Sequence, residues 1–126
     1  MADLSIQREG GPSVAPLLRV ERFVEGGVVI LRATGEIDLS TTPLLAERFD
    51  QEPVQVDVPL VVDLTGVDFL ASSGLGLLAE RSQRYADLGA RLTVVAPHRA
   101  VLRSIELTGL TEIITVVPSV EEAVAR

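Results

Sequence analysis

Two adjacent serines, Ser72 and Ser73, stand where a short apolar run gives way to Gly74-Leu75-Gly76. The apolar run of Val61, Val62 and Leu64 predicts a buried strand, and after the serines the apolar spacing changes to that of a helix. A serine hydroxyl at the start of a helix lies beside free backbone N–H groups and the positive end of the helix dipole. Both favour an added phosphate, so the serine pair is physically suited to phosphorylation.

A helical wheel of about 100° per residue separates the two serines. Its core side is a stripe of the width expected of a helix lying on a sheet, made of Leu75, Leu78, Ala79, Ser82, Tyr85 and Ala86. Ser73 projects on the opposite side, with Leu77, Glu80, Arg84 and Leu88. Ser72 lies nearer the buried edge, where it is better placed as a cap. The wheel therefore predicts that Ser73 is the phosphorylated residue.

Leu77 is an apolar residue on the predicted outward face, one turn beyond Ser73 and next to Gly76. Two glycines early in a helix cost about 1 kcal/mol each relative to alanine, so Gly74 and Gly76 need a local reason. One reason is that they leave room for an approaching protein surface, with Leu77 as the apolar contact. The other is that they only allow the helix to pack closely, since single exposed leucines are ordinary.

Length, charge and composition narrow the classes of function. A chain of 126 residues, 47% of them hydrophobic, is long enough for one domain with a real core. Its net charge of -7, with only three phenylalanines and one tyrosine, opposes binding to nucleic acid or to an anionic membrane. The expected partner is therefore another protein. The absence of cysteine and of any export or membrane-spanning pattern indicates a cytoplasmic protein.

Strands and helices are predicted to alternate along residues 17–126, after an arm at residues 1–16 that is expected to be flexible because it is rich in glycine, proline and charge. A glycine turn at residues 25–27 joins the first two strands as a hairpin. Further strands are expected at residues 60–64, 91–96 and 113–117, and helices after Ser40-Thr41-Thr42-Pro43 and at residues 73–88, 97–107 and 119–125. This alternation requires parallel pairing in the second half, so the sheet is mixed.

Four segments, in their order along the chain, resemble the STAS domain of bacterial anti-sigma factor antagonists. They are Gly35-Glu36-Ile37-Asp38, Val62-Asp63-Leu64, Phe69-Leu70-Ala71-Ser72-Ser73-Gly74-Leu75-Gly76 and Thr108-Gly109-Leu110. The resemblance covers residues 17–126 and implies a single α/β domain of the STAS type. Such a domain has a mixed sheet of four or five strands with helices mainly on one face, and it is a binding protein rather than an enzyme.

The resemblance implies a function that depends on exchange of partners. The unphosphorylated antagonist binds a cognate anti-sigma factor that is also a serine kinase, and the sigma factor is released. Phosphorylation of the serine before Gly-Leu-Gly, here Ser73, breaks the complex, and a serine phosphatase restores the antagonist. The expected partner-binding residues are Asp38, Ser72, Gly74, Gly76, Leu77, Glu80 and Arg84.

Two positions leave alternatives open. Asp38 lies in the loop that the family places near the switch serine, so it either helps to position the kinase or its nucleotide or is only a turn residue before Ser40. Ala71 stands where family members often carry an aspartate. If that carboxylate aligns the serine or recruits the kinase, phosphorylation here is slow, absent or carried out by a divergent partner. The alternative function is a non-phosphorylated STAS adaptor or scaffold in a signalling or transport complex.

The rest of the chain supports no other chemistry. A nucleophile elbow needs glycine on both sides of Ser73, at positions 71 and 75, but alanine and leucine stand there, and His98 is the only histidine. Lysine is absent and no group of His, Asp and Glu has metal-ligand spacing, so we expect no metal and no cofactor.

An apolar patch around Leu77 and the hairpin edge could support a homodimer, although nothing in the pattern requires one.

Overall fold

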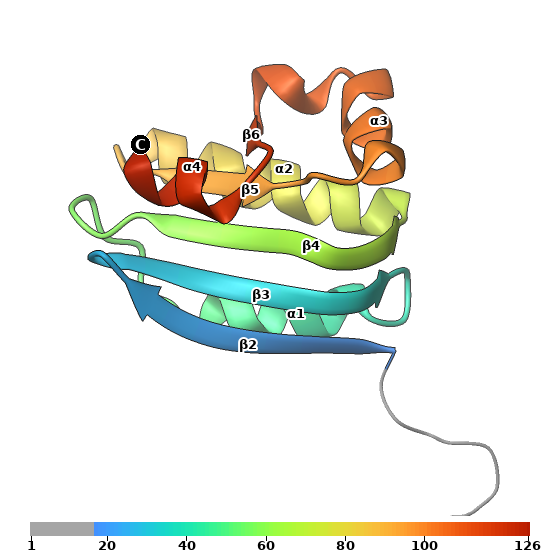
Figure 1. Cartoon of the computed structure of the whole chain (residues 1–126), viewed down its shortest axis with the longest axis horizontal. Helices are drawn as coiled ribbons and strands as arrows, with labels where there is room; N and C mark the ends of the chain where they lie inside the picture. The colour runs from blue at the N-terminus through green and yellow to red at the C-terminus, as the bar shows by residue number, and fades with distance from the viewer. Residues whose placement is uncertain (1–16) are drawn as a thin grey trace, which may run out of the picture.

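The computed structural model describes residues 17–126, and the arm expected at residues 1–16 lies outside this range. Its strands form one sheet in the order β2-β3-β4-β5-β6, with β2 (Leu18–Glu25), β3 (Val28–Ile37), β4 (Leu60–Leu70), β5 (Leu92–Val95) and β6 (Thr115–Val117). The helices are α1 (Thr42–Asp50), α2 (Ser72–Asp87), α3 (Arg99–Leu107) and α4 (Val120–Ala125), with a 3-10 turn η1 (Leu110–Glu112) (Figure 1). β2 and β3 are antiparallel and the other neighbours are parallel, which confirms the mixed sheet and the α/β class.

The first two strands form the predicted hairpin. Gly26 and Gly27 make its turn with φ angles of 58° and 77°. Positive φ at both central residues is what a two-residue hairpin turn needs if its twist is to match that of the strands.

β4 continues well past residue 64, where its apolar pattern ends. The added residues pair with β3, so that Glu36 lies opposite Phe69 and Ile37 opposite Leu70. Backbone pairing builds this part of the strand, and side-chain periodicity does not report such pairing. Because β3 and β4 are parallel and end together, the loops that follow them emerge side by side.

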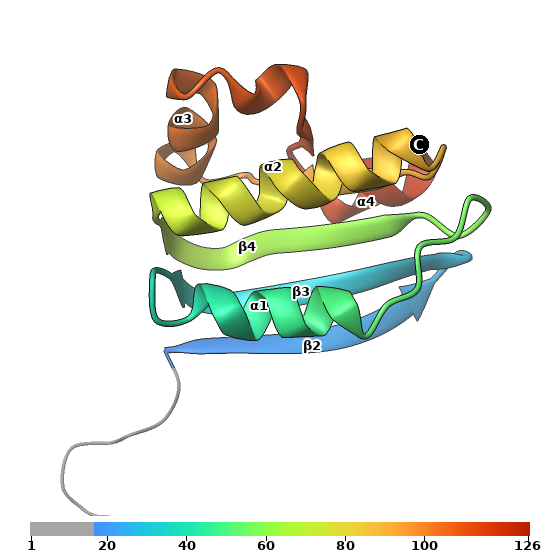
Figure 2. The ribbon, with the colours of Figure 1, turned by 180° about the vertical axis from the view of Figure 1, so that it is seen from behind.

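The helices cover the two faces of the sheet unequally, as expected. Figure 2 shows α1 and α2 in front of the strands, whereas α4 lies on the far side, which Figure 1 shows from the front. The larger core packs beneath α1, α2 and α3 and includes Leu31, Leu45, Val62, Leu64, Leu78 and Ile105. A smaller cluster beneath α4 includes Ile30, Val61, Val95 and Ala123.

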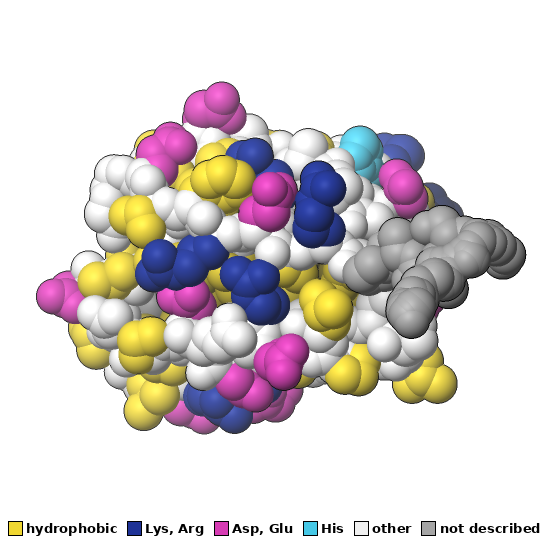
Figure 3. Space-filling view, turned by 90° about the horizontal axis from the view of Figure 1, so that it is seen from below, with side chains coloured by type: hydrophobic (Ala, Val, Ile, Leu, Met, Phe, Trp, Pro, Cys, Tyr) yellow, Lys and Arg dark blue, Asp and Glu magenta, His cyan; other side chains and the backbone are white. Residues whose placement is uncertain are grey.

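The outer edge of β2 carries charged side chains. Arg48 of α1 donates from Nη1 to the carbonyl oxygen of Val20 at 2.6 Å, and Arg22 pairs with Glu52 at 2.7 Å. Figure 3 looks onto this side of the molecule, where arginine and acidic side chains lie among apolar ones. Charged groups at an edge strand hinder its pairing with another chain.

Several element bounds differ from expectation. α2 begins at Ser72, one residue early, α3 begins at Arg99, and β6 begins only at Thr115, because η1 occupies the chain before it. Gly89 and Gly109, with φ of 72° and 74°, follow the ends of α2 and α3 as expected. None of the helices in residues 17–126 is long and apolar enough to cross a membrane.

Candidate functional site

The predicted switch serine lies where the carboxyl ends of β3 and β4 meet. Ala71, directly after β4, donates its N–H to the carbonyl of Ile37, the last residue of β3, at 2.8 Å. This bond ties the start of α2 to the β3–α1 loop, residues 38–41. The loop and the first turn of α2 therefore form one surface, which we call the Ser73 surface.

The N-terminus of α2 has no side-chain cap from the residues that the structure describes. Ala71 is its N-cap residue, with φ -80° and ψ 169°, and the first turn contains no acidic residue. The first N–H groups of a helix have no partner within it, and here no carboxylate offsets the positive end of the dipole. This end can therefore accept a negatively charged group.

The exposure of the two serines differs from what the helical wheel predicted. Ser72 is exposed and occupies the first helical position, so its expected place near the buried edge and its role as a cap are wrong. Ser73 is half-buried rather than fully outward. The reason is α1, which packs beside α2 and which a wheel drawn for one helix does not include.

Ser73 contacts Thr42, one of the hydroxyl residues that precede the first helix in the sequence. Its Oγ lies 2.9 Å from Oγ1 of Thr42, at the start of α1. The Thr42 hydroxyl also donates to the backbone carbonyl of Asp38 at 2.7 Å. The site thus contains a chain of three oxygen atoms that links α2, α1 and the β3–α1 loop.

Asp38 organises that loop. Its Oδ1 accepts from the N–H and the hydroxyl of Ser40, at 2.9 and 2.8 Å, and from the N–H of Thr41 at 3.0 Å. These bonds, led by the one from the Ser40 hydroxyl, hold the pKa of Asp38 below its ordinary value. The turn role is therefore present in the structure, and the proposed role toward a kinase would have to coexist with it.

Glycine stands at positions 74 and 76 of α2 in two different environments. A Cβ on Gly74 would lie 2.5 Å from Cγ2 of Ile37 and 2.7 Å from Cδ1 of Leu70, so close packing on the sheet demands glycine there. Gly74 is buried, so its own surface offers little to a partner, and its place among the partner-binding residues stays a prediction. Gly76 is exposed, and a Cβ there would meet nothing within 4 Å.

The outer face of α2 continues the surface beyond Gly76. Glu80 and Arg84 are exposed and paired with each other at 3.3 Å. With Gln83, Asp87 and Leu88 they line an open groove of about 480 Å³. Leu77 is only half-exposed and packs against the larger core, so it is less outward than the wheel predicted.

Three side chains not predicted as site residues also lie at or near this surface. Leu39 in the β3–α1 loop is 81% exposed and Phe69 near the end of β4 is 51% exposed, so both add apolar area to the end of the sheet that carries Ser73. Arg81 is buried and joins α2 to Asp50 of α1 at 2.8 Å. Exposure of large apolar residues could not be read from their pattern, because strand pairing and loop geometry decide it.

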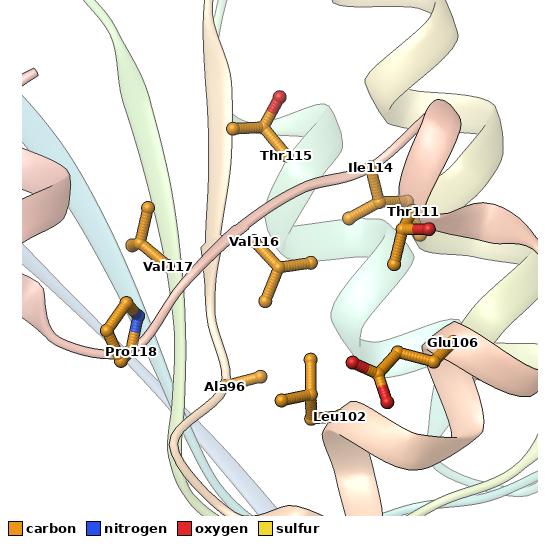
Figure 4. Close-up of a pocket in the computed structure, with 9 residues that line it drawn as sticks. All are labelled: Ala96, Leu102, Glu106, Thr111, Ile114, Thr115, Val116, Val117 and Pro118. Atoms are coloured by element: carbon orange, nitrogen blue, oxygen red, sulfur yellow. The ribbon is translucent and has the colours of Figure 1, made fainter.

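A separate cavity of about 450 Å³ lies between β6, α3 and η1. Its lining is mostly aliphatic, and the carboxylate of Glu106 points toward Leu102 (Figure 4). It shares no residue with the Ser73 surface. His98 bonds through Nε2 to the carbonyl of Thr65, so the histidine considered for a hydrolase is engaged with the backbone of β4.

Known proteins are similar to this chain in sequence and in fold. The STAS domain model matches residues 20–123. The chain is 38% identical over 84 residues to the anti-sigma-F factor antagonist RsfB of Mycobacterium tuberculosis, which covers 67% of this chain and 68% of RsfB. An anti-sigma factor antagonist from Mycobacterium paratuberculosis has a crystal structure with a TM-score of 0.79 and 30% identity, over 86% of this chain and 92% of that one.

More distant structures support the fold alone. The anti-sigma factor antagonist SpoIIAA in its unphosphorylated form has a TM-score of 0.65 at 21% identity, over 86% of this chain and 94% of that one. Together with the match over residues 20–123, and with the five-stranded mixed sheet and the serine pair that opens α2, these similarities place the chain in the STAS domain family.

Proposed function

We propose that this protein is an anti-sigma factor antagonist that binds a cognate anti-sigma factor through the Ser73 surface and thereby frees a sigma factor. The observation that carries the proposal is a serine hydroxyl in the first turn of an uncapped helix, at the junction of two loops, in a STAS domain. Relatives with 30% and 38% identity bear the name of anti-sigma factor antagonists. The protein acts by binding, and the complex forms in the cytoplasm.

Phosphorylation of Ser73 is the off-switch in this proposal. The anti-sigma factor supplies the serine kinase activity and a serine phosphatase reverses the modification. A phosphate at this position gains from the dipole and N–H groups of α2, so the fold tolerates it. The same dianion lies in the docking surface, where a partner must desolvate it, so it opposes binding.

The docking surface would combine apolar and charged groups. Leu39 and Phe69 supply exposed apolar area at the end of the sheet that carries Ser73, and Gly76 lets a partner approach the backbone of α2. Ser72, Glu80 and Arg84 provide exposed polar contacts. Interfaces of this kind commonly have an apolar centre with a polar rim. Asp38 would act mainly by holding the loop that carries Leu39.

The second candidate is an adaptor that uses the same surface without phosphorylation. The specific observation in its favour is Ala71, the N-cap residue of α2, which offers no carboxylate beside the serines. Binding through Leu39, Phe69 and Gly76 does not depend on that group. The two candidates therefore differ in the fate of Ser73 and not in the position of the interface.

Reconstitution with purified components tests the proposal. Each anti-sigma factor kinase encoded by the source organism is titrated against the wild type, Ser73→Ala and Ser73→Asp, and intact mass is recorded after addition of ATP. We expect one kinase to bind the wild type and Ser73→Ala, to bind Ser73→Asp at least about tenfold more weakly, and to add one phosphate to the wild type alone. Binding that Ser73→Ala abolishes would refute the switch, and binding with no phosphate on any serine would favour the adaptor.

A further inference from the structure

The hydroxyl groups of Ser73 and Thr42 come from residues 31 positions apart in the chain and meet at 2.9 Å. Thr42 Oγ1 is also 2.7 Å from the backbone carbonyl oxygen of Asp38. Both Ser73 and Thr42 are half-buried. The contact is therefore partly shielded from water, which strengthens a hydrogen bond relative to one on an open surface.

The direction of each bond follows from counting protons. A carbonyl oxygen can only accept, and a threonine hydroxyl has a single proton to donate. Since Thr42 donates that proton to the Asp38 carbonyl, it must accept in its contact with Ser73. In the unmodified protein Ser73 is the donor, and its hydroxyl proton is directed at Thr42.

Phosphorylation removes this donor. In the transfer from a nucleoside triphosphate, the Ser73 O–H bond breaks and an Oγ–P bond forms, while the bond from phosphorus to the leaving diphosphate breaks and the serine proton passes to a base of the kinase or to water. The resulting ester oxygen carries no hydrogen. Thr42 then faces a phosphate, which is an anionic acceptor and a stronger one than the neutral Asp38 carbonyl.

We propose that Thr42 is a positioning residue that responds to the phosphorylation state of Ser73. Its hydroxyl accepts a hydrogen bond from the free serine and donates one to the phosphate. The inference rests on the proposed role of Ser73 as the phosphorylated residue. It assigns to Thr42 a function in the switch beyond its place as the first residue of α1. Thr42 thereby transmits the modification from α2 to the β3–α1 loop.

The loop can release the Thr42 hydroxyl at low cost. The Asp38 carbonyl also accepts the backbone N–H groups of Thr41 and Thr42, at 3.2 and 2.9 Å. It therefore stays hydrogen-bonded when the hydroxyl turns to the phosphate, and no buried acceptor is left without a partner. The loop nevertheless loses one of its ties to α1, and this loop carries the exposed Leu39.

A phosphorus NMR titration tests the inference without a kinase. Phosphoserine is installed at position 73 during translation, and its second ionisation, ordinarily near pH 6, is followed in the wild type, Thr42→Val and Thr42→Ser. A hydrogen bond from Thr42 favours the dianion, so Thr42→Val should raise the pKa of the phosphate on the order of half a unit and Thr42→Ser should restore it. Hydrogen exchange at residues 39–42 should quicken on phosphorylation in the wild type but not in Thr42→Val.

Phosphoserine at position 72 is the matched control, because Ser72 is exposed and lies outside the Thr42 network. Its titration should not respond to Thr42→Val. A phosphate at position 73 whose titration is equally unchanged in a folded Thr42→Val protein would overturn the inference. This result is independent of whether any kinase modifies Ser73 in cells, so the inference and the proposed function can fail separately. Thr42→Ser retains the hydroxyl and covers the case in which valine disturbs the fold.

Discussion

Gly74 of α2 packs so closely on Ile37 of β3 that a Cβ on the glycine would lie 2.5 Å from Cγ2 of Ile37. This contact sets how near the first turn of α2 comes to the end of the sheet. It also fixes Ser73, the neighbour of Gly74, against the start of α1. The packing of a single glycine thus determines the position of the proposed switch.

Substituting the two glycines of α2 should have opposite effects on stability. Gly74→Ala forces Ile37 and Leu70 to move, and we expect a loss of about 1–3 kcal/mol in the free energy of unfolding. Gly76→Ala meets open space and should gain up to about 1 kcal/mol through helix propensity. Urea denaturation measures both. If the two variants were equally stable, the close approach of α2 to β3 would be refuted.

The exposed glycine also allows a test of docking that is separate from folding. Gly76→Arg places a long charged side chain on the outer face of α2, where the fold has room for it. We expect a stability within about 1 kcal/mol of wild type and binding to the anti-sigma factor that is at least about tenfold weaker. Calorimetric titration measures the affinity. Undiminished binding would place the interface away from Gly76.

The buried Arg81 should contribute more to the stability of the fold than the exposed Arg84 on the same helix. Arg81 is buried, pairs with Asp50 at 2.8 Å and with Glu80 at 2.7 Å, and lies over the ring of Phe49 at 5.3 Å. Arg81→Met removes both ion pairs and the cation–π contact that joins α2 to α1, and should cost about 1–2 kcal/mol of stability. Arg84→Met is the control: it removes only the exposed pair with Glu80, which should contribute less than about 0.5 kcal/mol, and leaves the contacts of Arg81 in place. Thermal unfolding of the two variants distinguishes them.

Replacing Arg48 with methionine should allow the exposed edge of β2 to pair with a second copy of the chain. Arg48→Met keeps an unbranched apolar stem but frees the Val20 carbonyl, which Arg48 occupies at 2.6 Å. Open backbone groups on an edge strand favour pairing with a second chain. We expect more self-association than in the wild type, measured by sedimentation velocity over a range of concentrations. Arg19→Met, on the same strand, leaves the Val20 bond in place and should behave as the wild type does; a monomeric Arg48→Met would show that Arg48 is not the protecting group.

The β3–α1 loop should lose its Asp38 hydrogen bonds only at a pH below the ordinary pKa of an aspartate. Hydrogen bonds from Ser40 and Thr41 lower the pKa of Asp38, so the ionised form favours the folded loop. This contribution is present above the pKa of the unfolded chain and is lost as the pH falls through the lower pKa of the folded state. Carbon NMR of the Asp38 carboxyl group should show the low midpoint, and Ser40→Ala should raise it. Ser72→Ala, outside the network, should leave the midpoint where it is.

The type and order of most elements could be predicted from local sequence. Gly26 and Gly27 specify a hairpin because only glycine adopts positive φ at both positions without strain. The change of apolar spacing at residues 71–74 marks the start of α2 because strands and helices bury side chains with different periods. These are properties of neighbouring residues, and the family motifs are local for the same reason.

The relations that define the site depend on contacts between distant residues. The wheel assigned Ser73 to the open side and Ser72 to the buried edge, whereas α1 half-buries Ser73 and leaves Ser72 exposed. The meeting of Ser73 with Thr42, the need for glycine at position 74 and the length of β4 all follow from how β3 pairs with β4. Sequence alone determined that this protein carries a serine at the start of a helix in a mixed α/β domain. Only the tertiary structure decided which hydroxyl that serine touches, because the register of two parallel strands sets the distance between the loops that follow them.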